Sequence, residues 1–466
     1  MGDSQVQYAT LSHCWGNLKF TTLATANLEV FRQGLPLHEL SKTFLDAIHI
    51  ARYLGFQYLW IDSLCILQDS TDDWIKESGM MMQVYGMSSL NIAATAAENG
   101  SVGCFFDRAQ DWRCQVRNSN QTILWNIHPP GFLASDRASN MLAKRGWVLQ
   151  ERYLPCRTIH FDDNQIFWEC NEYSACEVHP SGLPDDRSRN MGFYLSKRPL
   201  TTALWGQIVK AYSKAELTNT SDKLVAIGGL ARLIQDNTGD EYIAGMWRKD
   251  FEHQLLWHST RDLNGHHRIN TGTPTWSWAS VQGAISYPDY QRVDGNRSDV
   301  QLCVCAHDIR ITHSSVNQFG GILDANLRLR CEYFYNGILT PTPRSEYRLR
   351  FGSRWSNILQ VYLDLSEVYA GKKESRPVYI LVVKSVAHGQ ASRPFDYLSI
   401  SGLLLEPTGL KRGQYRRVGY WHHDGGRLST LQKVAADHDL VSRRSVDDFA
   451  DMSTEGENER FFIDLV

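Results

Sequence analysis

Apolar residues near the N-terminus are spaced first like a strand and then like a helix. Residues 8–16 begin as a short buried strand and end at a glycine that permits a tight turn. Ser41 can cap a helix over 42–54, where apolar residues recur every three to four positions. Residues 56–61 then form a continuous apolar run, which is typical of a central parallel strand. The pattern predicts one β-α-β unit.

A second helix and a third strand follow this unit. Ser70 or Thr71 can cap a helix that has two aspartates in its first turn and ends at Gly86. Residues 89–95 are short and apolar, so strands and helices alternate through the first third of the chain. We therefore expect an α/β domain with an open parallel sheet of the flavodoxin-like kind.

Ligands of such sheets bind beyond the carboxyl ends of the strands. The loops that meet this condition begin near Trp15, Asp62 and Thr95. These loops are where we expect candidate chemistry in the N-terminal domain.

The pattern changes twice farther along the chain. Residues 181–200 are rich in Ser, Pro, Arg and Asp, which is typical of a connecting loop, and helical spacing dominates from 204 to 256. Short strands follow, and the acidic residues 447–459 are expected to be a solvated tail. The expected strands are 302–305, 327–331, 378–383 and 397–402. We predict three domains: α/β over 1–184, helical over 185–280 and β-rich over 281–466.

Composition and charge narrow the classes of partner. The chain has 466 residues, and its 48 basic and 51 acidic side chains give a net charge of -3, so neither nucleic acid nor an anionic membrane is an expected partner. The polar N-terminus and the lack of an 18-residue apolar stretch favour a cytoplasmic protein without a membrane span. Ten cysteines without dense spacing fit reduced thiols.

Three tryptophan-containing blocks, at 8–16, 59–68 and 145–151, are distinctive. Together they resemble the heterokaryon-incompatibility (HET) domain of filamentous fungi. Later blocks at 221–230, 242–247 and 274–280 are similar to the helical region that commonly accompanies this domain. Members of the family usually carry more sequence before the first block than the seven residues found here, so we expect an N-terminal strand or helix to be missing.

The resemblance implies a trigger of non-self recognition and regulated cell death that acts through a domain similar to Toll/interleukin-1 receptor (TIR) domains. It also implies an activating or allelic protein partner and self-assembly. Some TIR domains cleave NAD with a Glu that follows a Trp by four residues on a helix, and Trp147 and Glu151 have this separation. NAD is then the expected substrate, and no further cofactor is required.

Two sets of site residues follow from that resemblance. Glu151 and Asp62 are the expected catalytic carboxylates, because a carboxylate beside the ribose stabilises the positive charge that develops there. The expected dinucleotide-binding residues are Ser12, Trp15, Gly16 and Trp147.

Each of these residues also has a structural interpretation. Glu151 could pair with Arg145 or Arg152 and orient its helix, Asp62 could cap the next turn, and the tryptophans could pack in the core. In that case the domain is a non-enzymatic signalling module that acts by assembly with a partner.

The thiols suggest two further sites. Cys14 or Cys65, with His13 or His160 and Asp62, could form a nucleophilic site if the fold brought them together. The other candidate is a zinc site at Cys170, Cys176 and His179, but its spacing is irregular and a fourth ligand is not evident, so we predict no metal.

Overall fold

The computed structural model describes most of the chain, in two compact units. Unit 1 comprises Met1–Thr201, Ala215–Thr218 and Val225–Asn237, and unit 2 comprises Thr202–Lys214, Asn219–Leu224 and Thr238–Val466. The chain therefore crosses between the units five times, at 201/202, 214/215, 218/219, 224/225 and 237/238. The described residues are 6–108, 113–118, 121–126, 141–183, 200–260, 266–269, 272–288, 298–314, 317–342, 347–351, 354–356, 360–365, 375–390, 393–426, 451–455 and 458–466.

Unit 1 is built on a mixed six-stranded sheet in the order β2-β1-β3-β6-β7-β8. Its strands are β1 (Tyr8–Ser12), β2 (Tyr58–Ile61), β3 (Leu90–Ala93), β6 (Arg157–Phe161), β7 (Ile166–Cys170) and β8 (Ser174–Cys176). The first four are parallel, in the 2-1-3-4 order of doubly wound folds. An additional hairpin pairs β4 (Arg113–Asn118) with β5 (Gln121–Asn126).

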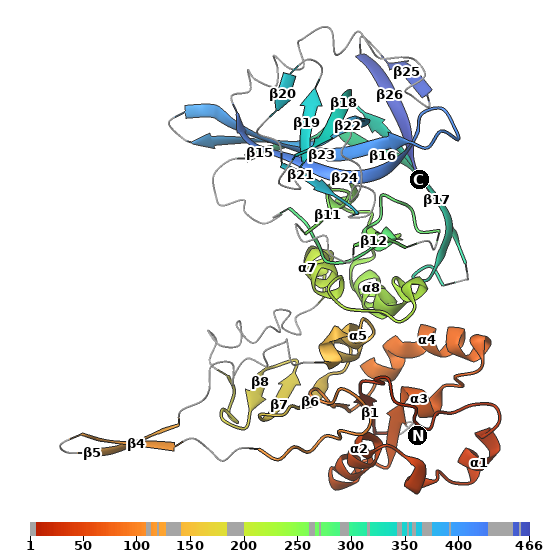
Figure 1. Cartoon of the computed structure of the whole chain (residues 1–466), viewed down its shortest axis with the longest axis vertical. Helices are drawn as coiled ribbons and strands as arrows, with labels where there is room; N and C mark the ends of the chain where they lie inside the picture. The colour runs from red at the N-terminus through yellow and green to blue at the C-terminus, as the bar shows by residue number, and fades with distance from the viewer. Residues whose placement is uncertain are drawn as a thin grey trace. The chain divides into compact units, whose positions relative to one another are not determined.

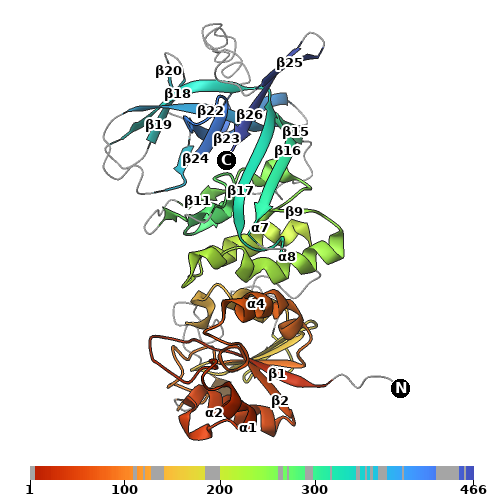
Figure 2. The ribbon, with the colours of Figure 1, turned by 90° about the vertical axis from the view of Figure 1, so that its right-hand side faces the viewer.

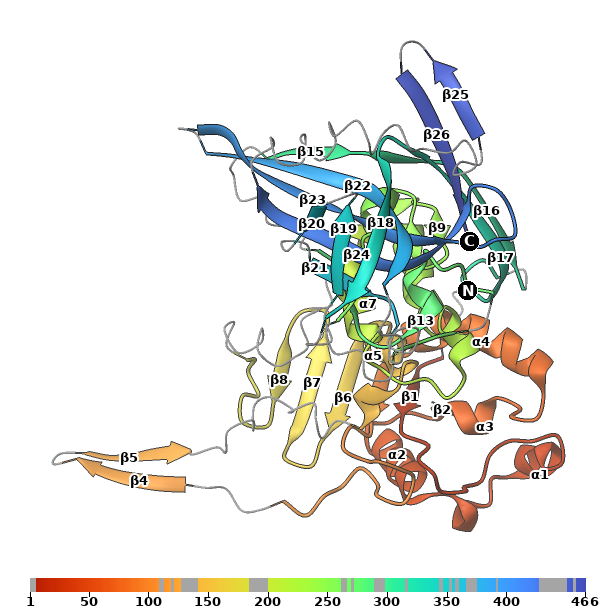
Figure 3. The same ribbon diagram turned by 45° about the horizontal axis from the view of Figure 1, so that its top comes forward.

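The expectation of an all-parallel sheet was wrong for the last two strands. β7 pairs antiparallel with β6, and β8 pairs antiparallel with β7 (Figure 3). The reason is the short connection from β6 to β7, residues 162–165, because a parallel crossover needs a dozen residues or more.

Helices cover both faces of this sheet. α2 lies on one face and α4 on the other, as Figures 1 and 2 show. The helices of unit 1 are α1 (Leu28–Gln33), α2 (Lys42–Tyr53), α3 (Asp62–Cys65), α4 (Thr71–Gly86), α5 (Val148–Tyr153) and most of α8 (Val225–Thr238), with short 3-10 turns at Leu37–Glu39 and Leu142–Lys144.

The local signals for α2 and α4 are confirmed. The Ser41 hydroxyl accepts a hydrogen bond from the Phe44 N–H, and the Ser70 hydroxyl accepts one from the Asp73 N–H. The apolar side of α2 packs on the apolar side of the sheet in one core cluster. Its members include Phe44, Ala47, Ile50, Ala51, Ala9, Leu11, Ile61, Leu90 and Ile92. Because strand side chains alternate, the intervening residues of β1, β2 and β3 face α4 and α5.

Unit 2 contains a 12-stranded sheet, so the expected β-rich C-terminal region is confirmed. Its main path runs β16-β17-β26-β24-β23-β22-β18-β19-β20, and Figure 3 shows the long strands β22 and β23 side by side. The strands are β15 (Ser298–Leu302), β16 (Val304–His313), β17 (Ile322–Cys331), β18 (Phe334–Pro341), β19 (Tyr347–Phe351), β20 (Arg354–Ser356), β21 (Gln360–Leu363), β22 (Arg376–Gln390), β23 (Arg393–Pro407), β24 (Gln414–Gly426), β25 (Asp451–Glu455) and β26 (Asn458–Leu465).

The expectation of an acidic tail at 447–459 was wrong for residues 451–455 and 458–459, which form β25 and the start of β26, whereas 447–450 and 456–457 lie outside the described residues. β26 pairs with β17 and β24, and β25 pairs with β26. The acidic composition of the segment did not indicate the apolar part of β26, where Phe461, Ile463 and Leu465 are buried in that sheet.

Residues 202–238 of the sequence alternate between the two units. α7 (Thr202–Tyr212) and α9 (Phe251–Gln254) belong to unit 2, whereas most of α8 belongs to unit 1. The predicted boundary at 184/185 lies outside the described residues. Unit 2 also has 3-10 turns at Thr220–Asp222 and Trp278–Ser280 and short strand pairs formed by β9 (Tyr242–Ile243), β10 (Met246–Trp247), β11 (His258–Ser259), β12 (His267–Arg268), β13 (Val281–Gln282) and β14 (Ile285–Ser286).

A fully buried ion pair joins β24 to other parts of unit 2. The Arg417 Nε and Nη2 atoms donate to the two Asp364 carboxylate oxygens at 3.0 and 3.1 Å, and both side chains are 0% exposed. Nη1 donates to the Leu255 carbonyl at 2.6 Å, and Nη2 also donates to the Trp257 carbonyl. The guanidinium carbon lies 3.6 Å from the centre of the Trp257 ring. One side chain thus fixes a strand and a loop together.

Lys223 is also buried in unit 2. Its ammonium group donates to the Val281 carbonyl and lies 5.7 Å from the centre of the Trp278 ring. Burial lowers the pKa of Lys223 from 10.5 to about 7, because the charged form loses its hydration.

This pKa predicts a pH-dependent stability. Between pH 7 and 10.5 the unfolded chain binds the Lys223 proton and the folded chain does not, so this residue makes stability rise with pH over that window. In urea unfolding, the difference in stability between Lys223→Met and wild type should change by about 1 kcal/mol per pH unit. Lys214→Met, at an exposed position, should show no such change. A constant difference for Lys223→Met would contradict the buried, neutral lysine.

Among the described residues, no helix combines the length and apolarity needed to cross a membrane.

Candidate functional site

A layer of polar side chains lies between the sheet of unit 1 and helix α5. The hydroxyls of Thr10 and Ser12 donate to the Asn91 amide oxygen at 3.0 and 3.2 Å. The Asn91 amide nitrogen in turn donates to the main-chain carbonyl of Glu151 at 3.2 Å. All four residues are buried, so strands β1 and β3 hold α5 at a defined height above the sheet.

The Glu151 side chain is 2% exposed and lies in this polar layer. Burial raises its pKa from 4.5 to about 7, and the nearby Asp62 carboxylate acts in the same direction. The positive charge of Arg145 and the polar Ser12 and Tyr85 hydroxyls beside the carboxylate favour the ionised form and limit the rise in the pKa. Glu151 therefore changes its charge near neutral pH.

Asp62 connects the ends of β1 and β2. One carboxylate oxygen accepts a hydrogen bond from the Trp15 indole N–H at 3.1 Å, and the other accepts one from the Ser63 main-chain N–H at 2.7 Å. Asp62 thus fixes both the Trp15 ring and the start of the following turn, and its catalytic role stays a prediction. His13 Nδ1 lies 3.7 Å from the Asp62 carboxylate, whose side chain is 18% exposed.

Arg145 and Gly16 complete the loop around Trp15. The Arg145 guanidinium donates to the His13 carbonyl and lies 6.0 Å from the centre of the Trp15 ring. Gly16 has a φ of 62°, and a Cβ atom there would approach the Asn99 Cβ within 2.5 Å. The position requires glycine for both its conformation and its space.

Five of the six predicted site residues therefore lie in one region at the carboxyl ends of the parallel strands: Ser12, Trp15, Gly16, Asp62 and Glu151. Trp147 is different, because its ring packs edge-on against Trp74 of α4 at 6.2 Å. Its main-chain carbonyl still accepts from the Glu151 N–H, so it begins the turn that carries Glu151. The roles assigned to all six residues stay predictions.

Tyr85 and Asn91 also lie at this site, although the sequence did not predict a role for them there. Asn91 had a signal, because an amide inside an otherwise apolar strand needs buried partners. Tyr85 sits on the buried side of α4, where its aromatic ring packs on Trp60 and its hydroxyl donates to the Leu11 carbonyl at 3.3 Å. Arg145, which the sequence suggests only as a partner for Glu151, also contacts the Trp15 loop.

A second polar network fixes the next residue of α5. Arg152 donates through two nitrogens to the Glu169 carboxylate, whose other neighbour is His160 Nε2 at 2.9 Å. His160 Nδ1 lies 3.2 Å from the Thr95 hydroxyl. Burial alone would raise the pKa of Glu169, but Arg152 and His160 more than offset it and hold the pKa far below its usual value. Arg152 therefore pairs with Glu169.

The geometry does not favour a nucleophilic site built from Cys14, His13 or His160, and Asp62. Burial raises the pKa of Cys14 to about 11, so its thiol is protonated at neutral pH. Burial also lowers the pKa of His13 to about 4, against the opposing effect of Asp62. His160 is engaged with Thr95 and Glu169.

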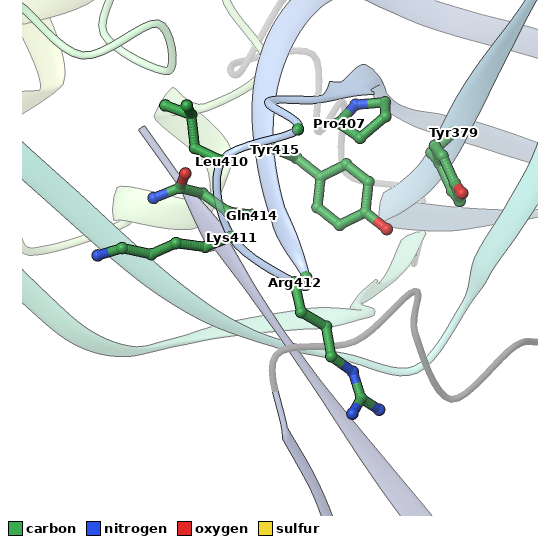
Figure 4. A pocket seen from close by; sticks show the side chains of 9 residues that line it. Tyr379, Pro407, Leu410, Lys411, Arg412, Gln414 and Tyr415 are labelled. Atoms are coloured by element: carbon green, nitrogen blue, oxygen red, sulfur yellow. The ribbon is translucent and has the colours of Figure 1, made fainter.

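Unit 2 has a pocket of about 370 Å³ at the turn between β23 and β24 (Figure 4). The described residues that line it include Lys411 and Arg412 but no carboxylate, histidine or cysteine. Such a lining suits binding of an anionic group better than acid-base chemistry. It contains none of the predicted site residues.

One of three comparisons with known proteins finds a relationship. Neither the curated proteins nor the solved structures include one that the chain matches. A family model does match, over residues 8–151, and its description is "Heterokaryon incompatibility protein (HET)". The match begins at β1 and ends at Glu151, so it spans all six predicted site residues. The N-terminal part of this chain, residues 8–151, is thus similar to heterokaryon-incompatibility (HET) proteins.

Proposed function

We propose that this protein is an effector of heterokaryon incompatibility that promotes regulated cell death by cleaving NAD. The observation that carries the proposal is the convergence of Glu151, Ser12, Asp62 and the Trp15 loop within the matched domain. The order of the four parallel strands and the spacing of Trp147 and Glu151 support a TIR-like relationship. The protein acts in the cytoplasm, where an activating or allelic partner triggers its self-assembly.

The proposed reaction is hydrolysis of the bond between ribose and nicotinamide. Nicotinamide leaves with the bonding electron pair, water adds to the ribose carbon, and the products are ADP-ribose, nicotinamide and a proton. Positive charge develops on the ribose as the bond breaks, and the ionised Glu151 stabilises that charge. Asp62 holds the Trp15 ring, whose half-exposed face can stack on a base of the dinucleotide.

The test is release of nicotinamide by the purified full-length protein. NAD is supplied at millimolar concentration and nicotinamide is followed by chromatography, with the protein both as purified and after induced oligomerisation. We expect release above the rate of a heat-denatured control. Absence of release in both states would overturn the enzymatic proposal.

One observation favours a non-enzymatic alternative. Glu151 is 2% exposed and tied into the polar layer, as expected for a residue that only orients α5. In that case the domain signals by assembly, and Glu151→Ala leaves cell killing intact while loss of assembly abolishes it. Expression of both kinds of variant, with viability as the readout, separates the two functions.

A further inference from the structure

Helix α5 cannot hold its own orientation. It has six residues, Val148–Tyr153, which is too short for a helix to be stable without tertiary contacts. Two of its anchors, Asn91 and Glu169, lie within the strands described above. A third set of anchors comes from residues far along the chain.

Residues 215–218 bind the loop that precedes α5. The Glu216 N–H donates to the Lys144 carbonyl at 2.6 Å, and the Gly146 N–H donates to the Glu216 carbonyl at 2.8 Å. Both hydrogen bonds flank Arg145, which forms a parallel bridge with Glu216. The main chain on both sides of Arg145 is thereby fixed.

Helix α8 packs directly against α5 and α4. A Cβ atom at Gly229 would lie 2.6 Å from the Gln150 side-chain oxygen, 3.3 Å from the Met82 Cβ and 3.4 Å from the Leu154 Cδ1. The close approach depends on the absence of a side chain at Gly229. Gln150 is buried and immediately precedes Glu151.

We infer that residues 215–218 and 225–237, here called the returning segments, are a positioning part of the candidate site although they lie outside the matched domain. They fix the loop that carries Arg145 and the helix that carries Glu151. The residues between them, 219–224, belong to unit 2, so the geometry of the site depends on a part of the chain continuous with that unit. The expected effect of these segments on catalysis rests on the proposed function, whereas their expected effect on the structure of the loop and of α5 does not.

Hydrogen exchange of the full-length protein, followed by mass spectrometry, tests the inference. Glu216→Pro removes the N–H that donates to Lys144, and Gly229→Leu forces α8 away from α5. The matched controls are Glu216→Ala, which keeps both main-chain hydrogen bonds, and Gly79→Leu on α4, where a Cβ atom meets open space. We expect residues 144–153 to exchange at least about tenfold faster in both test variants, equivalent to about 1.4 kcal/mol of local opening.

Peptides from β1 report whether a variant remains folded. If Glu216→Pro also loses protection in β1, Gly229→Leu decides the test. If the amide hydrogens of residues 144–153 exchange at the wild-type rate in a folded test variant, the inference is overturned. If nicotinamide is released, kcat should fall in the test variants with little change in KM. If the wild-type protein releases none, the proposed reaction fails, and the exchange result still decides the positioning role.

Discussion

Replacement of Glu151 by Gln should reduce nicotinamide release by at least about 100-fold while the protein stays folded. Gln has nearly the shape of Glu and fits the same polar layer, but it has no charge to stabilise the positive charge that the proposed reaction develops on the ribose. The variant should not be less stable, because burial disfavours the charged Glu151 carboxylate in the folded chain.

The pH dependence gives a second readout of the same substitution. Because the pKa of Glu151 is raised to about 7 and the proposed reaction needs the ionised form, wild-type turnover should rise tenfold per pH unit below about pH 7 and level off above it. The residual activity of Glu151→Gln should lack this transition. Glu98→Gln, at an exposed position in the same domain, is the matched control and should behave as wild type. Equal turnover of Glu151→Gln and wild type would exclude Glu151 from the reaction.

Replacement of Arg417 by Met should destabilise the protein by about 3–5 kcal/mol, the usual cost of leaving one partner of a buried ion pair uncompensated. The substitution leaves the Asp364 carboxylate without its charge partner at a position that is 0% exposed, and it removes donors from the Leu255 and Trp257 carbonyls. The midpoint of urea unfolding, followed by tryptophan fluorescence, measures the loss.

The neighbouring arginine provides the control for this experiment. Arg416 pairs with Glu406 at 3.1 Å, but its side chain is 56% exposed, so Arg416→Met should cost less than about 1 kcal/mol. Combining Arg417→Met with Asp364→Leu should recover part of the stability, because no charge is then left buried. A loss for Arg417→Met no larger than that for Arg416→Met would show that the pair is not a main determinant of stability.

The parts of the site that could be predicted are those whose signals are local. Ser41 and Ser70 indicated where helices start, because the serine hydroxyl accepts a hydrogen bond from the main-chain N–H three residues later. The proximity of Trp15 and Asp62 followed from topology, because both residues come just after neighbouring parallel strands. Glu151 is different, since α5 is too short to show a helical period. Only the family resemblance pointed to that residue.

The parts that could not be predicted depend on long-range pairing or on main-chain atoms. Arg417 and Asp364 are 53 residues apart, and neither stands out among the many charged residues of the chain. The strand β26 was hidden by acidic neighbours, whose charges lower the apparent hydrophobicity of the segment. The contacts of Glu216 with 144–146 use only main-chain groups, so no side-chain pattern marks them.

The five crossings of the chain between the two units also constrain how such a gene can recombine. A single breakpoint between residues 151 and 215 would transfer the matched segment, residues 8–151, without residues 215–218 and 225–237, leaving the recipient's copy of these residues to pack against a foreign α5. Main-chain contacts such as those of Glu216 tolerate this exchange, whereas the contact at Gly229 requires a glycine in the recipient. Exchange of the matched segment between diverged genes should therefore succeed where the recipient has glycine at that position.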